Sequence, residues 1–294
     1  MLDEVLEHLR PRPGEVFLDG TAGGGGHAAA LVERIRPGGQ LVLLDRDREA
    51  LERLMARFGR QGDIRYFHAN FSDFDQALDE AALRQIDGAL LDLGLSSLQL
   101  AAADRGFSFD LPGPLDMRFD PSDRLTAEVI VNRWEADRLA ALFRDYGDMP
   151  FSQRIARAII EARQREPLKR TDQLAGIVRS AVPADWRRKQ RIHPATRVFQ
   201  ALRMAVNDEL RSLETFFEKI FDRLKPGGRV VVISFHSGED RIVKHRLREA
   251  ALDGRAELLT PKPMTPTPQE VDANPRSRSA RLRAAVRLPA TGDR

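Results

Sequence analysis

A run of four glycines behind a short apolar segment constrains this chain more than any other feature. Residues 16–19 read Val-Phe-Leu-Asp, Gly23–Gly26 follow, and a helix rich in small residues is predicted from His27 onward. Glycines allow positive φ and let a ligand approach bare backbone N–H groups. The N-terminus of the following helix favours anionic or polar ligand groups. The pattern predicts a nucleotide-type site at the carboxyl end of a first strand, with an ordinary glycine-rich turn as the alternative.

A second acid supports the ligand site. Residues 41–45 are predicted to form another buried strand, and it ends in Asp45. This acid lies about 20 residues beyond the glycines, the spacing at which a carboxylate accepts both ribose hydroxyls of a bound cofactor. The two features together indicate a cofactor that carries adenosine. They also fit a nicotinamide dinucleotide, because Gly23-x-Gly25-x-x-Ala28 matches the loose dinucleotide fingerprint.

Strands and helices alternate through the first third of the chain. Near-continuous apolar strands between helices predict a parallel sheet that is covered on both faces. The predicted strands are 16–19, 41–45, 64–68 and 89–92, and the predicted helices are 27–36, 48–58 and 72–83.

The alternation stops after the fourth strand and later resumes. Residues 105–124 read as a loop, and 127–191 read as short helices that Pro150, Pro167 and Pro183 separate. Beyond them the sequence predicts a long helix over 194–224 closed by the turn 225–228, a strand over 229–234, a helix over 239–251, a proline-rich loop over 261–275, and strands over 257–260 and 282–288.

The last two strands suggest a terminal antiparallel hairpin, which favours the methyltransferase cofactor fold over that of dehydrogenases by analogy. The expected fold is therefore α/β, a Rossmann-like seven-stranded S-adenosylmethionine-dependent methyltransferase sheet with an inserted all-helical domain. The expected boundaries are 1–103 for the first part of the core, 104–192 for the helical insertion, and 193–294 for the second part of the core.

Composition excludes several classes of site and protein. The 294 residues include no cysteine, which excludes a disulfide framework, a thiolate zinc site and a cysteine nucleophile. No apolar run approaches the length of a membrane span, and the N-terminus lacks a signal-peptide pattern, so a cytoplasmic protein without a membrane partner is expected. A formal net charge of +3 permits a polyanionic partner.

Acids end three of the predicted strands, at Asp19, Asp45 and Asp92. Ligands bind at the carboxyl ends of strands in this class of fold, although a helix N-cap is an equally good reading of any single one. Asp45 is the candidate for the ribose, and Asp19 is expected to order the glycine loop. Phe71 follows the third strand and could stack on adenine or serve equally well as a core residue.

A polar cluster follows the strand over 229–234. His236 stands beside two serines and is followed by Glu239 and Asp240, which makes it a candidate for acid–base chemistry or for substrate binding. The alternative is a hydrogen-bonded histidine, with Ser237 capping the next helix and Asp240 near the third helical position.

The residue types narrow the acceptor of a methyl group. Carbon-5 methylation of a pyrimidine needs a covalent nucleophile, usually cysteine, and ribose methylation of the common type needs a lysine that lowers the hydroxyl pKa. None of the six lysines ends a core strand. A nitrogen acceptor remains, because an exocyclic amine needs orientation and proton acceptors but no metal. Suitable catalytic groups are Asp92, Ser96, Ser97 and His236.

Several motifs in order resemble those of the MraW-like family of bacterial ribosomal RNA small subunit methyltransferases H, over Met1 to about Arg287. One departure is Tyr146-Gly-Asp-Met149, where the family usually reads Tyr-Gly-Glu-Glu. The motifs that carry the resemblance are Asp19-Gly-Thr-Ala-Gly-Gly-Gly-Gly-His27, Asp45-Arg-Asp47, Leu91-Asp-Leu-Gly-Leu-Ser-Ser97, Arg105-Gly-Phe-Ser-Phe109, Pro114-Leu-Asp-Met-Arg118, His193-Pro-Ala-Thr-Arg197, Phe199-Gln-Ala-Leu-Arg203, Ile233-Ser-Phe-His-Ser237, Glu239-Asp-Arg241 and Asn274-Pro-Arg-Ser-Arg-Ser279.

The resemblance implies S-adenosylmethionine-dependent N4-methylation of a decoding-centre cytidine in 16S rRNA of the small ribosomal subunit, with the helical insertion helping to bind substrate. The quaternary state is open, with a homodimer among the options. The nicotinamide-dependent oxidoreductase and a non-catalytic rRNA-binding assembly factor are the alternatives. By motif position, the implied cofactor-binding residues are Gly25, Gly26, His27, Asp45, Phe71, Asp92 and Gln99.

Overall fold

The computed structural model describes residues 1–59, 62–190 and 192–289, and the chain forms two compact units. The first unit combines Met1–Gly94 with the chain from Leu210 onward, and the second consists of Leu95–Glu209. The predicted boundaries at 104 and 192 both lie inside the second unit.

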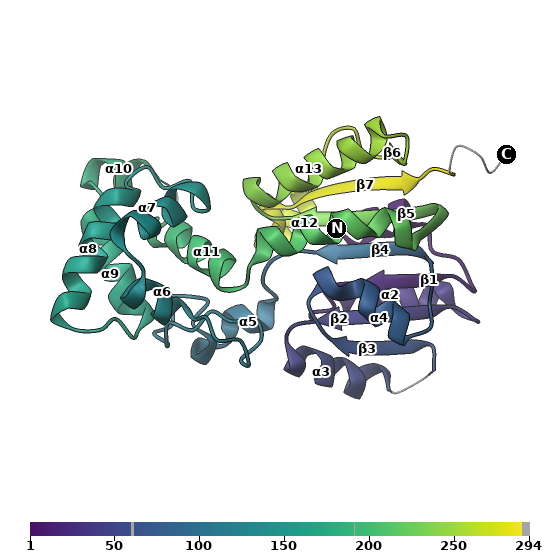
Figure 1. Cartoon of the computed structure of the whole chain (residues 1–294), viewed down its shortest axis with the longest axis horizontal. Coiled ribbons are helices and arrows are strands. Elements are labelled where there is room, and N and C mark those ends of the chain that lie inside the picture. The colour runs from purple at the N-terminus through teal and green to yellow at the C-terminus, as the bar shows by residue number, and fades with distance from the viewer. Residues whose placement is uncertain (60–61, 191, 290–294) are drawn as a thin grey trace. The chain divides into compact units, whose positions relative to one another are not determined.

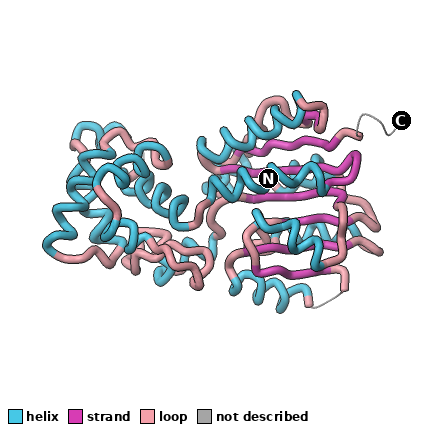
Figure 2. The backbone as a smooth tube through the Cα atoms, in the orientation of Figure 1, coloured by secondary structure: helices cyan, strands magenta, loops and turns pink. Residues whose placement is uncertain are grey.

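The first unit is built around a seven-stranded sheet in the order β3-β2-β1-β4-β5-β7-β6 (Figure 1, Figure 2). β1 to β5 run parallel, whereas β7 pairs antiparallel with both β5 and β6. This arrangement confirms the predicted Rossmann-like sheet with its terminal antiparallel pair. The strands are β1 (Val16–Asp19), β2 (Gln40–Asp45), β3 (Ile64–His68), β4 (Ile86–Asp92), β5 (Leu224–Ser234), β6 (Ala256–Leu258) and β7 (Arg281–Arg287).

Helices cover both faces of this sheet because successive side chains of its apolar strands point to opposite sides. Phe17 and Leu43 belong to a core with α1, α2 and α3, whereas Leu18 and Leu44 belong to a second core with α4, α12 and α13. The helices of the unit are α1 (Leu2–Leu9), α2 (Gly26–Ile35), α3 (Arg48–Phe58), α4 (Phe74–Glu80), α12 (Glu209–Arg223), α13 (Ser237–Leu252) and α14 (Pro268–Ala273).

The second unit is helical and has a core of its own. Ile130, Phe143, Ile155 and Val178 are fully buried in it and come from four successive helices. The predicted punctuation by proline is confirmed, since Pro183 is the N-cap of α10 and the other two prolines precede α8 and α9. Its helices are α5 (Ser97–Ala101), α6 (Ala127–Arg133), α7 (Ala136–Asp145), α8 (Ser152–Arg165), α9 (Thr171–Ala181), α10 (Ala184–Lys189) and α11 (Pro194–Val206).

The long helix predicted over 194–224 is wrong, because the chain breaks between α11 and α12. Asp208 has a φ of 50°, which interrupts the helix. The side chain of Asn207 is fully buried and donates to the carbonyls of Met117 and Arg203, while its Oδ1 accepts from the N–H of Phe119. Bonds to a segment about ninety residues earlier therefore fix the break.

Two smaller expectations are also corrected. The proline-rich loop over 261–275 contains α14, which begins where Thr267 Oγ1 accepts from the N–H of Glu270 and Pro268 takes the first helical position. The turn over 225–228 lies within β5, whose register against β4 shifts there. None of the helices that the structure describes is both long and apolar enough to cross a membrane.

The Asn207 bonds generate a stability prediction. Asn207→Ala removes the bonds of the buried side chain to the N–H of Phe119 and to the carbonyl of Met117, so the free energy of unfolding should fall by about 2–4 kcal/mol. Urea denaturation followed by circular dichroism measures the loss. Gln164→Ala on the exposed side of α8 is the control and should change stability by less than about 0.5 kcal/mol. Equal stability of the two variants would contradict the role given to Asn207.

Candidate functional site

The glycine loop follows β1 and is attached to the carboxyl ends of β4 and β2, the strands on either side of it. The N–H of Gly20 donates to the carbonyl of Leu90 at 3.0 Å, and that of Ala22 donates to the carbonyl of Leu44 at 3.0 Å. Gly25 is the N-cap of α2 with a φ of 74°, and a Cβ there would lie 2.3 Å from a methyl carbon of Leu54. Glycine is therefore favoured at this position, above all because its φ is positive.

Hydrogen bonds to Asp45 attach the glycine loop to the end of β2. Its Oδ2 accepts from the N–H of Gly23 at 2.8 Å, and its Oδ1 accepts from the N–H of Asp47 at 2.8 Å. Burial raises the pKa of this carboxyl, and the backbone donors only partly oppose that rise. Each carboxylate oxygen has a further lone pair, so the predicted bond to a ribose hydroxyl is compatible with this geometry and stays a prediction.

Asp19 orders the start of the same loop, as expected. Its side chain is 1% exposed, and its Oδ1 accepts from the N–H of Thr21 at 3.1 Å and from the hydroxyl of Thr21 at 3.4 Å. Burial raises the pKa of Asp19 to about 6, against the opposing charge of His27. The hydroxyl of Thr21 in turn accepts from the N–H of Asp92 at 2.6 Å, which connects the ends of β1 and β4.

His27 and Asp92 face each other beside this turn. His27 Nε2 lies 3.4 Å from Asp92 Oδ2. Burial acts to lower the pKa of His27, but the carboxylates of Asp92 and Asp19 outweigh it and the pKa is raised. His27 Nδ1 and Asp92 Oδ1 are buried and find no hydrogen-bond partner among the described residues. Because buried polar atoms are nearly always paired, these two atoms fit a bound ligand that carries polar groups.

Phe71 lies close to the glycine loop but also belongs to the packing of the unit. A Cβ added to Gly20 would lie 2.9 Å from the Cβ of Phe71. The ring meets that of Phe216 edge to face at 6.2 Å, and its side chain is only partly buried. Its position is therefore compatible with adenine stacking as well as with the core role.

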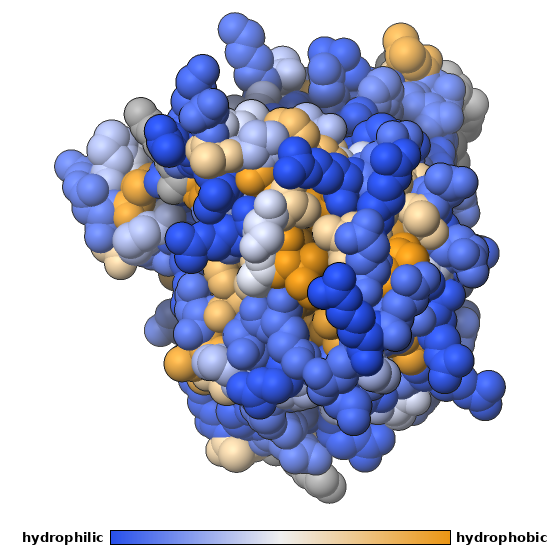
Figure 3. Space-filling view, turned by 90° about the vertical axis from the view of Figure 1, so that its left-hand side faces the viewer, coloured by the Kyte–Doolittle hydropathy of each residue, from blue (hydrophilic) through white to orange (hydrophobic). Residues whose placement is uncertain are grey.

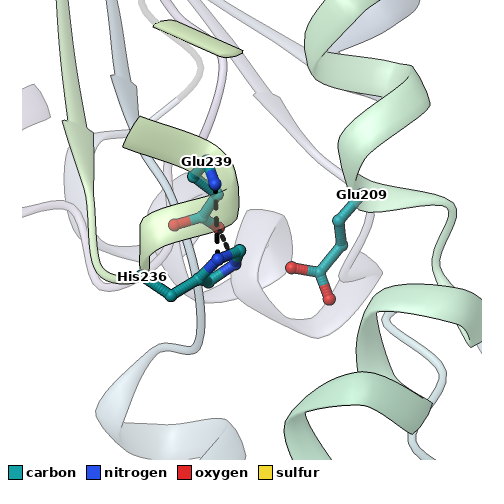
Figure 4. A group of neighbouring side chains, drawn as sticks. All are labelled: Glu209, His236 and Glu239. Atoms are coloured by element: carbon teal, nitrogen blue, oxygen red, sulfur yellow. Dashed lines mark hydrogen bonds and ion pairs between the residues drawn. The ribbon is translucent and has the colours of Figure 1, made fainter. Parts of the chain in front are cut away.

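His236 is the N-cap of α13. Its Nδ1 accepts from the N–H of Glu239 at 3.3 Å (Figure 4). Oε2 of Glu239 accepts from the N–H of Phe235 at 2.9 Å. His236 Nε2 lies 3.0 Å from Glu239 Oε1, at ion-pair distance but without hydrogen-bond geometry. Since Nδ1 is the acceptor, the neutral ring carries its proton on Nε2.

The N-cap of α13 was expected to be Ser237, but it is His236. Asp240, the other acid of this cluster, forms ion pairs with two arginines of β7. Asp240 is 5% exposed and accepts from Arg283 at 2.7 Å and from Arg281 at 3.0 Å. Burial acts to raise the pKa of Asp240, but the two guanidinium groups outweigh it and lower the pKa. Asp240 therefore ties α13 to β7 and is not available as a proton acceptor. No local sequence pattern indicates this pairing, because Arg281 and Arg283 lie about forty residues from Asp240.

β4 and β5 bring Asp92 and the segment before His236 to the same edge of the sheet. Asp92 is the register partner of Ile233, and the N–H of Leu93 donates to the carbonyl of Ile233 at 2.9 Å. A Cβ on Gly94 would lie 3.5 Å from the ring of Phe235. The first unit therefore gathers a glycine loop, buried carboxylates and two histidines at the carboxyl ends of its strands, which suits a ligand with polar and aromatic parts.

Ser96, Ser97 and Gln99 begin the second unit and share one local motif. Ser96 Oγ accepts from the N–H of Gln99 at 3.2 Å, and Gln99 Oε1 accepts from the N–H of Ser96 at 3.0 Å. This reciprocal pair is a capping box that starts α5. The Ser-x-x-Gln spacing was a readable signal for it. The predicted site residues are thus divided between the two units, and the roles of these three stay predictions.

Comparison with known proteins gives consistent matches over almost the whole chain. Residues 1–288 match the model of a family described as the MraW methylase family. A protein of Nitratidesulfovibrio vulgaris Miyazaki F named ribosomal RNA small subunit methyltransferase H is 52% identical over 305 residues, which cover 98% of this chain and 84% of that protein. A protein of the same name from Pelobacter propionicus is 49% identical over 306 residues, which cover 98% and 97%.

Solved structures resemble the chain more distantly. A Streptococcus mutans protein in complex with SAH aligns over 98% of this chain and 97% of its own, with 12% sequence identity and a TM-score of 0.46. Likeness at this level bears on neither ligand nor activity.

The buried carboxyl of Asp19 predicts a pH-dependent stability. Its folded pKa of about 6 lies above the unfolded value of 3.8, so the folded state loses stability as pH rises from 4 to 7. Asp19→Asn keeps an oxygen for Thr21 and removes the charge, and it should gain about 3 kcal/mol relative to the unchanged protein at pH 7.5 but little at pH 4.

Urea denaturation at the two pH values measures this difference. Asp222→Asn, on the exposed side of α12, is the control and should show no pH-dependent gain. The same difference at pH 4 and at pH 7.5 for Asp19→Asn would show that burial does not raise this pKa.

Proposed function

This chain belongs to the MraW methylase family, and from that premise we propose that it transfers a methyl group from S-adenosylmethionine to N4 of a decoding-centre (P-site) cytidine in 16S rRNA. The observation that carries the proposal is the match of residues 1–288 to the family model, together with relatives of about half-identical sequence that share one name. Membership of a methylase family favours a methyl donor over a nicotinamide cofactor at the glycine loop.

The residues of the first unit fit such a cofactor. Asp45 would accept from the ribose hydroxyls, Phe71 would face the adenine, and Gly25, Gly26 and the pair His27–Asp92 would line the rest of the site. The unpartnered atom His27 Nδ1 supports this assignment, because a polar group of the cofactor would satisfy it. When bound, S-adenosylmethionine supplies a methyl group activated by a positive sulfur.

The chain must also orient the amine and take up a proton. A cytosine N4 amine that gains a methyl group has to lose one N–H proton, so an acceptor near the nitrogen is required. Asp92 can accept it at Oδ1, which has no partner among the described residues. His236 presents a protonated Nε2, since its Nδ1 is occupied by the cap of α13. We therefore assign proton acceptance to Asp92 and orientation of the base to His236, with Ser96 and Ser97 as further hydrogen-bonding groups.

Nucleoside mass spectrometry tests the function. Ribosomal RNA from a deletion strain is incubated with S-adenosylmethionine, with and without the purified protein, both as free 16S rRNA and within small subunits. One N4-methylcytidine should appear only where the protein is present. A target cytidine that stays unmodified in both preparations, or a methyl group at another atom, would refute the proposal.

Loss of the Asp45 carboxylate should weaken cofactor binding. Asp45→Ala removes both the ribose acceptor and the bond that holds Gly23, so the affinity for S-adenosylmethionine should fall more than tenfold, or by at least about 1.4 kcal/mol. Isothermal titration calorimetry measures it, with the exposed Asp222→Ala as the matched control. Unchanged affinity in Asp45→Ala would remove Asp45 from the site.

The assignment of the proton acceptor gives a separate prediction for turnover. Asp92→Asn should lower kcat by about 10²-fold or more and alter cofactor affinity much less. His236→Asn should lower kcat less, because His236 orients the base and does not take up the proton. Asparagine is a good N-cap, so the loss should not come from unfolding of α13. Single-turnover methylation assays and calorimetry on the same samples separate the two quantities. A loss confined to cofactor affinity would move Asp92 to the cofactor side only.

A further inference from the structure

Positive charge is concentrated in one part of the second unit. Residues 150–200 contain twelve lysines and arginines but only four acids, whereas 95–149 contain six and ten. The basic stretch spans α8, α9, α10 and the start of α11. The view in Figure 3 shows a largely hydrophilic face interrupted by small apolar patches. An excess of positive charge in one stretch of the chain favours a partner with a phosphate backbone.

Two of the sequence motifs meet within this unit. The ring of His193 lies 5.0 Å from that of Phe109, and Phe109 lies 5.0 Å from the buried Phe199. His193 is the N-cap of α11, where its Nδ1 accepts from the N–H of Ala195 at 3.2 Å. The neutral ring therefore carries its proton on Nε2, and no described residue accepts from that atom. The catalytic scheme uses neither motif.

Arg179 and Arg187, which come from other helices, affect the pKa of His193. Burial lowers the pKa of His193, and the charges of Arg179 on α9 and Arg187 on α10 lower it further, whereas Asp110 acts in the opposite direction. Neither arginine forms an ion pair among the described residues, and Nε of Arg187 is buried without a hydrogen-bond partner. Neither guanidinium group therefore has a carboxylate partner among the described residues, and the charges of both act on the ring of His193.

Apolar side chains flank this group along the chain. Leu111 is 50% exposed and Ile192 is 41% exposed, and each is close in sequence to one of the two rings. Exposed apolar groups beside arginines and aromatic rings are the combination on which single-stranded nucleic acid binds. Bases stack on the rings and phosphates pair with the guanidinium groups.

We propose that Phe109, Arg179, Arg187 and His193, the arginine–ring cluster, bind a single-stranded segment of the RNA substrate. Arg179 and Arg187 hold successive phosphates, a base lies against the His193–Phe109 pair, and Nε2–H of His193 donates to a base or phosphate oxygen. The proposal rests on the proposed function in that it takes the substrate to be RNA. It adds which surface of the second unit holds the strand.

Salt dependence of binding tests the two arginines. Arg179→Gln/Arg187→Gln should weaken binding of a 16S rRNA transcript at least tenfold and reduce the slope of log affinity against log salt by about 1.4, because each phosphate contact on a single strand contributes about 0.7. Arg154→Gln/Arg157→Gln removes two exposed charges from α8 and is the charge-matched control. Its slope should change less. Equal changes in both double variants would show a diffuse charge effect and overturn the assigned cluster.

Substitutions in the His193–Phe109 pair should lower the affinity for RNA without changing its salt dependence. His193→Asn keeps the cap of α11, and Phe109→Leu keeps an apolar side chain, so both remove stacking without removing charge. Binding should weaken several-fold in each while the salt slope stays that of the unchanged protein. Unchanged affinity in both variants would exclude stacking on this pair.

One further readout separates the two proposals. Affinity for S-adenosylhomocysteine should be the same in every variant, which shows that the first unit is intact. If the unchanged protein methylates 16S rRNA but Arg179→Gln/Arg187→Gln binds it with full affinity and slope, the cluster is wrong and the function stands. If the unchanged protein neither binds nor methylates the RNA, both proposals fall.

Discussion

The carboxylate of Asp45 accepts from the backbone of Gly23 and of Asp47, and these two bonds join the second strand of the sheet to the loop that follows the first. A loop of four glycines does not favour a single conformation by itself, because glycine loses more conformational freedom on ordering than any other residue. Buried hydrogen-bonding groups at the strand ends supply that shape. Asp19 does the same one strand away, and its raised pKa shows what its burial costs.

Two histidines in this chain are held in place by the helices that they begin. His193 and His236 each use Nδ1 as the N-cap of a long helix, which leaves the proton on Nε2 in both rings. His27 differs, since its Nε2 faces Asp92 and its pKa is raised. Local capping thus decides which ring atom can meet a substrate, and this choice favours Asp92 over His236 as the acceptor of a proton.

Much of the first unit could be predicted from the sequence, because its strands are continuous apolar runs and several of its helices carry local signals. β1, β3 and α3 were placed at their observed limits, and the acids at the strand ends lie where the pattern put them. The family resemblance is confirmed, and the predictions that His27 and Gln99 bind the cofactor came from it alone. The break at Asn207 and the pairing of Asp240 with Arg283 escaped prediction, since both depend on partners far along the chain.

The second unit interrupts the sheet between β4 and β5, and this has a consequence for synthesis on the ribosome. Four parallel strands leave the exit tunnel first, and β4 then waits about 130 residues for its neighbour. At bacterial or eukaryotic elongation rates this delay lasts roughly 7–26 s. Through that interval the incomplete sheet exposes β4 as an edge strand, which can pair with strands of other chains. The helical unit emerges complete during the same interval and can fold before β5 is made. Nascent chains of this protein should therefore be most prone to aggregate before the fifth strand arrives.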